Sequence, residues 1–123
     1  MRVTASHLTP WLPPAVAAVW LAFAPAAASA ADAGILARGK EIAFDPTKGN
    51  CLACHQIDDG ESPGDLGPPL VAIKARFPNK QVLRQHMWDP MENSPSTRMP
   101  PFGRHRILSE GELDLLVEYI YTL

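Results

Sequence analysis

The sequence is poor in cysteine: its 123 residues include two, Cys51 and Cys54, which stand three positions apart. A disulfide across so short a loop would stabilise the chain little, so the fold cannot depend on disulfide bonds. Lysine is also scarce, with four residues, and the whole chain has a formal net charge of -2. This balance excludes the basic surface that binding to nucleic acid or to an anionic membrane requires, so neither is an expected partner.

The first thirty residues contain no acidic residue and a single basic one, Arg2. An apolar run from Trp11 to Ala28 follows, and the small-residue triplet Ala28-Ser29-Ala30 ends it. This order is typical of a secretory signal peptide, so we expect residues 1–30 to be cleaved and residues 31–123 to form the mature domain. An uncleaved anchor is the alternative, but prolines interrupt the run and it is short for a bilayer span. The sequence therefore predicts a periplasmic protein without a stable membrane anchor.

Apolar residues at helical spacing and weak strand signals predict an all-α domain: a first helix over residues 32–44, one or two short helices between residues 70 and 88, and a terminal helix. The residues expected on buried faces before the terminal helix are Ile35, Leu36, Ile42, Ala43, Leu70, Ile73, Phe77, Val82, Leu83 and Met87. Asn79 is expected to cap the second short helix. The terminal helix has the clearest signal, because Ser109 and Glu112 form a capping box ahead of Leu113, Leu116, Val117 and Ile120.

Cys51-Leu52-Ala53-Cys54-His55 is the attachment pattern of a c-type haem. Two thiols at this spacing can form thioethers with the two vinyl groups of one porphyrin, which brings the His55 imidazole beneath the iron. We therefore expect one covalent haem c with His55 as an axial ligand. Three alternatives compete: a thiol–disulfide redox pair lacks its βαβ pattern, a structural zinc site lacks a second ligand pair, and a plain disulfide leaves His55 without a role.

The sixth iron ligand could come from Met87, Met91, Met99, His86 or His105. Met99 is the expected ligand because Pro100 and Pro101 stiffen the loop over residues 90–103 that carries it. His105 is the next candidate. With a neutral thioether on the iron both axial positions are filled, which favours electron transfer and leaves no catalytic residue on this chain.

Basic residues crowd the end of this loop, at Arg98, Arg104, His105 and Arg106. They could neutralise the haem propionates, form a solvated face or dock an acidic partner. Trp88 could border the haem or fill the core. The sequence leaves these roles open.

A first helix, the motif ending at His55, the segment Gly67-Pro68-Pro69-Leu70, a Met-Pro loop and a closing helix together resemble a class I cytochrome c. The resemblance implies a single small domain wrapped around one haem. It also implies that the Pro68 carbonyl orients His55 and that Met99 is the ligand opposite. A proline carbonyl suits the first role, because it accepts a hydrogen bond while the ring stiffens the chain.

Four segments further resemble the SoxX subunits of the bacterial sulfur-oxidation system: residues 49–55, 67–71, 75–78 and, most specifically, 99–108. The resemblance implies a SoxA cytochrome as partner in a heterodimer and a downstream cytochrome c as electron acceptor. It also implies a joint oxidoreductase reaction, that of an L-cysteine S-thiosulfotransferase, which attaches thiosulfate to a cysteine of the carrier SoxYZ.

Because haem attachment uses both cysteines of this chain, we expect the sulfur chemistry on another chain. Two alternatives share the haem features. One is a free-diffusing periplasmic electron carrier between respiratory complexes, although such carriers often dock through a lysine-rich face. The other is a haem-based gas sensor, which would need a labile sixth ligand.

Overall fold

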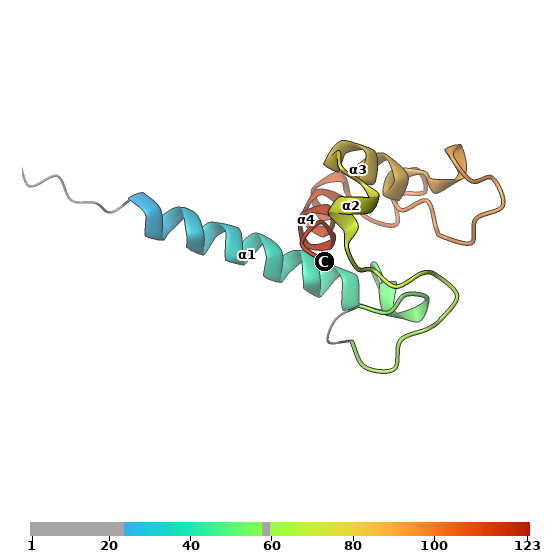
Figure 1. Cartoon of the computed structure of the whole chain (residues 1–123), viewed down its shortest axis with the longest axis horizontal. Coiled ribbons are helices and arrows are strands. Elements are labelled where there is room, and N and C mark those ends of the chain that lie inside the picture. Colours follow the sequence, from blue (N-terminus) through green and yellow to red (C-terminus); the bar gives the residue numbers. More distant parts are fainter. Residues whose placement is uncertain (1–23, 58–59) are drawn as a thin grey trace, which may run out of the picture.

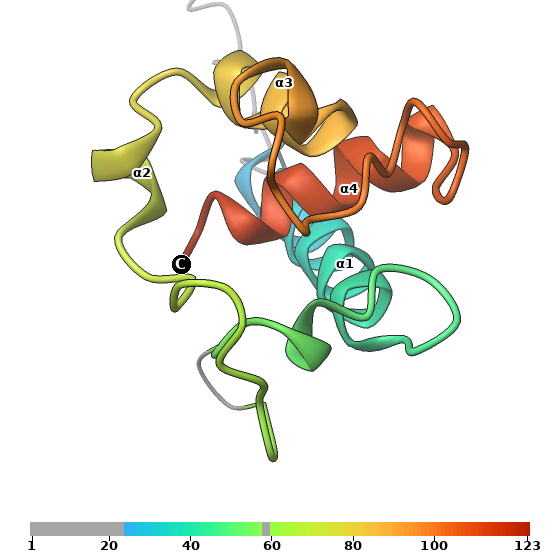
Figure 2. The ribbon, with the colours of Figure 1, turned by 90° about the vertical axis from the view of Figure 1, so that its right-hand side faces the viewer.

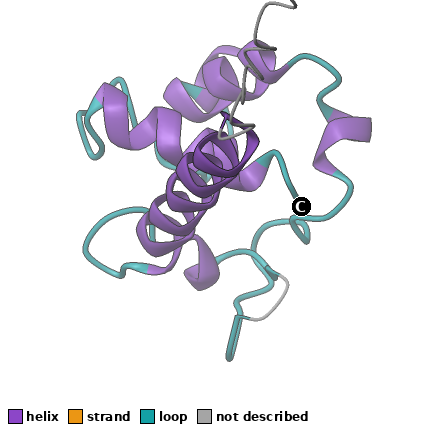
Figure 3. Cartoon of the chain, turned by 90° about the vertical axis from the view of Figure 1, so that its left-hand side faces the viewer, coloured by secondary structure: helices purple, strands orange, loops and turns teal. Residues whose placement is uncertain are grey.

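The computed structural model describes residues 24–57 and 60–123, and all regular structure in these ranges is helical (Figure 1, Figure 3). The elements in chain order are α1 (Ala24–Phe44), the 3₁₀ turn η1 (Cys51–Ala53), α2 (Ile73–Arg76), α3 (Lys80–Trp88), the 3₁₀ turn η2 (Pro90–Glu92) and α4 (Glu110–Ile120). The predicted all-α class is confirmed. Most of the predicted signal peptide, residues 1–23, lies outside the described residues.

The first and last helices cross and form the centre of the fold (Figure 2). Gly39 lies at the crossing, where a Cβ atom would overlap the Leu115 carbonyl oxygen and the Tyr119 Cβ atom. Glycine therefore allows the two helices to approach this closely. Ile42 is buried on the next turn of α1, but Ile35 is 37% exposed because the N-terminal half of α1 extends beyond α4 (Figure 1). The predicted burial of Ile35 is thus wrong.

Helix α1 begins at Ala24, whereas the sequence predicted a start near residue 32. Residues 24–33 are rich in alanine, which has the highest helix propensity, and Pro25 is tolerated in a first turn. The helix therefore runs through the predicted cleavage point after residue 30. Cleavage there stays a prediction.

The first short helix also differs from its prediction. It was expected from residue 70 but begins at Ile73, because Ala72 before it adopts a left-handed conformation with φ 50°. A residue in that conformation interrupts the right-handed helix. Leu70 is consequently half-buried on the preceding loop, while Ile73 is buried.

Helix α3 begins where the sequence predicted, with the Asn79 side chain accepting a hydrogen bond from the Gln81 N–H at 2.8 Å. Leu83 and Met87, four residues apart, are both buried on one face. Val82, expected with them, is 52% exposed, because neighbouring residues on a helix point about 100° apart.

The capping box that starts α4 is confirmed. The Ser109 hydroxyl accepts a hydrogen bond from the Glu112 N–H at 3.3 Å, and the Glu112 carboxylate accepts one from the Ser109 N–H at 3.0 Å. Lys48 also donates to the Glu112 carboxylate from the turn after α1. The Lys48 hydrogen bond, followed by those from Ser109, lowers the pKa of Glu112 to about 2.

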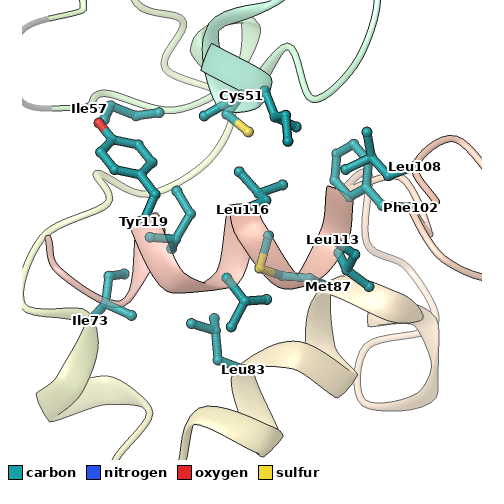
Figure 4. Close-up of a cluster of buried hydrophobic side chains, with 14 residues drawn as sticks. Cys51, Ile57, Ile73, Leu83, Met87, Phe102, Leu108, Leu113, Leu116 and Tyr119 are labelled. Carbon is teal, nitrogen blue, oxygen red and sulfur yellow. The ribbon is translucent and has the colours of Figure 1, made fainter. Parts of the chain in front are cut away.

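The core gathers around α4 (Figure 4). Its predicted face is confirmed, with Leu113, Leu116, Val117 and Ile120 all buried. Side chains from the end of α1, from η1, α2 and α3 and from the connecting loops complete this core, including Ile42, Cys51, Ile57, Ile73, Leu83, Met87, Phe102 and Leu108. Helix α4 therefore fixes α1, α3 and the two loops that carry the candidate site relative to one another.

Candidate functional site

Asp45 organises the turn that leads from α1 into the site. Its carboxylate accepts hydrogen bonds from the N–H and the hydroxyl of Thr47, both at 2.7 Å, and these bonds lower the pKa of Asp45. Its carbonyl accepts from the N–H groups of Lys48 and Asn50 at 3.0 Å. Asn50 takes a left-handed conformation, φ 48°, which asparagine tolerates better than most residues. The chain thereby reverses and enters η1.

The two cysteines lie at the start and just after the end of η1. Cys51 is buried, Cys54 is half-buried, and no disulfide joins them. Burial raises the pKa of the Cys51 thiol to about 12, so this group stays protonated at neutral pH. A thiol–disulfide redox pair relies on a lowered thiol pKa, so the environment of Cys51 disfavours that alternative.

His55 is held by the segment that the sequence singled out. Its Nδ1 lies 2.7 Å from the Pro68 carbonyl oxygen, which confirms the predicted hydrogen bond. A carbonyl can only accept, so Nδ1 is the donor, and in the neutral imidazole Nε2 then keeps a lone pair that can bind a metal. Gly67 makes this possible, because a Cβ atom there would overlap the His55 ring. Its own N–H donates to the Cys54 carbonyl at 2.7 Å, which ties the two segments together.

Met99 approaches from the other end of the sequence, on the connection between α3 and α4. Its side chain is half-buried, and its N–H donates to the Thr97 hydroxyl at 3.2 Å. Pro101 and Phe102 just after it are buried, so the chain is anchored in the core immediately beyond Met99. The thioether therefore sits on a constrained stretch of backbone.

Cys51, Cys54, His55 and Met99 all line one cavity of about 490 Å³. That volume lies within the range of roughly 300–1,000 Å³ that is usual for cofactor and ligand pockets. The apolar part of the wall is formed by Leu66, Leu70, Ile73, Phe77, Leu83, Met87, Phe102, Ile107 and Ile120. Two thiols, an imidazole and a thioether facing an apolar space form the donor set that a haem c requires, so these residues fit that cofactor.

The other residues considered as iron ligands divide into two groups. Met91 and His105 are exposed and do not line the cavity, which removes the runner-up His105 from the site. His86 and Met87 do line it, from α3. Met87 is packed in the core as expected. The pKa of His86 is lowered by its burial and, to a smaller extent, by the positive charge of Arg76.

The basic residues near Met99 have different surroundings. Arg98 lines the cavity, whereas Arg104 forms an ion pair with buried Asp89 at 2.7 Å. Arg106 and His105 are exposed. Trp88 does not border the cavity: its indole packs where a Cβ atom of Gly103 would otherwise stand. Arg98 is therefore the one of these residues that faces the cofactor cavity, while the Arg104 charge is paired with Asp89.

The sequence did not predict the polar part of the cavity wall. It includes Lys48, Asn50, Arg76 and Thr97. Arg76 also donates to the Pro69 carbonyl at 3.1 Å, next to the carbonyl that orients His55. None of these residues belongs to a recognisable sequence motif. Their positions beside the cavity are therefore visible only in the folded structure.

Within residues 24–57 and 60–123, no helix is both long and apolar enough to cross a membrane. The same part of the chain contains no group of three or more His, Cys, Asp or Glu side chains arranged to hold a metal ion.

The family model for cytochrome c matches residues 36–123 of the chain, which include every residue that lines the cavity. An uncharacterized lipoprotein of Aquifex aeolicus (strain VF5) is 29% identical over 75 residues. The aligned region covers 60% of this chain and 36% of the Aquifex protein, so the chain spans about a third of the length of that curated relative.

Proposed function

The chain belongs to the cytochrome c family, and from this premise we propose that it is the electron-transfer subunit of a SoxAX-type complex. The fold is that of an all-α class I cytochrome c, and the cofactor of the family is a covalently bound haem c. The observation that carries the electron-transfer part of the proposal is the convergence of Cys51, Cys54, His55 and Met99 on one largely apolar cavity.

Each of these residues has a proposed role toward the cofactor. Cys51 and Cys54 would hold the porphyrin through thioethers, His55, oriented by Pro68, would bind the iron, and Met99 would supply a second iron ligand. When bound, haem c supplies a one-electron couple, and the neutral Met99 thioether raises its reduction potential. The apolar walls would keep water from the cofactor, and with His55 and Met99 both binding the iron no ligand position would remain for a substrate. This arrangement suits electron transfer.

The proposed place in sulfur oxidation rests on the resemblance to SoxX subunits, above all over residues 99–108. In that role the chain pairs with a SoxA-like cytochrome. The joint reaction forms an S–S bond between thiosulfate and the cysteine of a carrier protein, releases the thiol proton and removes an electron pair. This chain passes those electrons singly to a downstream cytochrome c.

The proposed division of labour agrees with the cysteine content. Haem attachment consumes Cys51 and Cys54, the two cysteines of the chain. No thiol is then left to carry a sulfur intermediate, so the bond-forming cysteine belongs to another chain. We also propose export to the periplasm, supported by the signal-like pattern of residues 1–30.

Thiosulfate-dependent reduction of the chain tests the proposal. The oxidised holoprotein is mixed with the SoxA-like subunit and the carrier protein, thiosulfate is added, and haem reduction is followed by absorbance. We expect reduction only when both other proteins are present, and none when the carrier cysteine is replaced by serine. Recovery of an isolated monomer that thiosulfate does not reduce under these conditions would contradict the proposal and favour a free-diffusing carrier.

A further inference from the structure

Met99 lies on a long connection between α3 and α4, residues 89–109. Apart from η2, this described stretch has no regular structure. Its backbone–backbone hydrogen bonds join residues three to six positions apart, as in Thr97 to Ser94 and His105 to Pro101, so they shape local turns and do not tie the two ends of the connection together. A metal ligand, in contrast, must be held in place by its surroundings.

Asp89, at the start of this connection, is only 3% exposed. One of its carboxylate oxygens accepts a hydrogen bond from the Met91 N–H at 3.1 Å and so caps η2. The other accepts from the Arg104 guanidinium at 2.7 Å. One buried carboxylate therefore binds the chain on both sides of Met99, at Met91 and at Arg104. Leaving such a carboxylate unpaired is costly, so the closed conformation is strongly favoured.

Backbone contacts beside the ion pair reinforce it. The Trp88 carbonyl accepts hydrogen bonds from the N–H groups of Gly103 and Arg104, both at 3.2 Å. Gly103 has no side chain at the place where the Trp88 indole packs. Main-chain hydrogen bonds from Trp88 and the side-chain ion pair of Asp89 thus both hold the segment at Gly103 and Arg104 in place.

We infer that the ion pair between Asp89 and Arg104 positions Met99 for its role as an axial ligand. The pair closes residues 89–104 into a loop, and Met99 on that loop lines the cavity. Neither Asp89 nor Arg104 lines the cavity, so both are positioning residues. The inference rests on the ligand role of Met99 in the proposed function.

The rate at which the reduced holoprotein binds carbon monoxide reports how often the thioether leaves the iron. We expect Arg104→Gln to raise this rate about ten- to one-hundred-fold, the factor expected for losing a hydrogen bond to a charged group. Arg104→Lys keeps the charge and should recover part of the effect. Arg106→Gln removes the same charge from an exposed residue two positions away and should bind carbon monoxide at the wild-type rate.

The proton NMR signal of the Met99 methyl group, shifted by the porphyrin ring current, gives a second readout. We expect this signal to broaden or disappear in Arg104→Gln and to stay unchanged in Arg106→Gln. A wild-type carbon monoxide rate and an unchanged methyl signal in Arg104→Gln would overturn the inference. If Arg104→Gln does not accumulate as holoprotein, Asp89→Asn replaces it, and a wild-type rate in that variant overturns the inference equally.

Met99→Ala separates this inference from the proposed function. Unchanged spectra and carbon monoxide binding in Met99→Ala would show that Met99 is not the ligand, and both proposals about it would fail. Fast binding in Met99→Ala with wild-type binding in Arg104→Gln would preserve the ligand and remove only the positioning role.

Discussion

Gly67 is the residue on which the orientation of His55 depends most directly. A Cβ atom at this position would lie 2.6 Å from Nδ1 and 2.8 Å from Nε2 of the His55 ring. Both distances are too short for nonbonded atoms, so either the ring or the backbone that carries Pro68 has to move. The hydrogen bond between Nδ1 and the Pro68 carbonyl would then be lost or lengthened.

Gly67→Ala is therefore expected to destabilise the holoprotein by about 1–3 kcal/mol, the usual cost of inserting a methyl group into a packed site. Guanidinium unfolding followed by haem absorbance measures this change. Gly34→Ala is the control, because a Cβ atom at Gly34 meets nothing within 4 Å. Equal stability of the two variants would contradict the role assigned to Gly67.

Glu112 gives the fold a defined pH dependence. Its folded-state pKa of about 2 lies below the value of about 4.3 expected in an unfolded chain. The ionised carboxylate therefore stabilises the fold above the unfolded pKa, and this contribution is lost as the pH falls from about 4 to 2.

Glu112→Gln removes the charge that pairs with Lys48 but leaves an amide oxygen that can still accept from Ser109, so we expect it to lower the free energy of unfolding by about 0.5 kcal/mol at pH 7, the usual size of a partly exposed ion pair. The difference from wild type should shrink as the pH falls below about 4 and vanish near pH 2. Urea titrations between these pH values measure it. Glu110→Gln, in the same helical turn but outside the capping box, should give a smaller difference. A constant difference for Glu112→Gln at every pH would refute the electrostatic account.

At the scale of elements, the crossing of α1 and α4 depends on Gly39. Gly39→Ala would place a methyl group against the Leu115 carbonyl oxygen and force the helices apart. We expect the free energy of unfolding to fall by about 1–3 kcal/mol, although alanine has a higher helix propensity than glycine. Gly111→Ala is the matched control: it is also helical, its Cβ atom meets nothing within 4 Å, and it should stabilise the protein slightly. Thermal unfolding of both variants compares them, and a stabilised Gly39→Ala would contradict this packing.

Helix ends could be predicted where the signal is local. Asn79 and the pair Ser109 and Glu112 cap the helices that follow them, because a capping side chain reaches backbone groups only two or three residues away. Buried faces were less predictable. Ile35 is exposed because α4 covers only the C-terminal part of α1, and the sequence does not indicate where along α1 the two helices cross.

At the scale of the whole molecule, the site joins segments that are distant in sequence. The motif ending at His55 and the Pro68 carbonyl could be predicted, because each is marked by residue types that few other functions require together. The polar residues that line the cavity, such as Arg76, could not be predicted from the sequence, and neither could the ion pair between Asp89 and Arg104. Those contacts exist only once α3 and both loops have packed around α4.

The proposed electron-transfer function depends on covalent attachment of haem to Cys51 and Cys54. Intact mass spectrometry of the protein, produced in cells with functional cytochrome c maturation machinery, tests this directly. We expect a mass equal to that of the polypeptide plus one haem, retained under denaturing conditions, together with a Soret absorption band. A colourless protein with the mass of the bare polypeptide would contradict it.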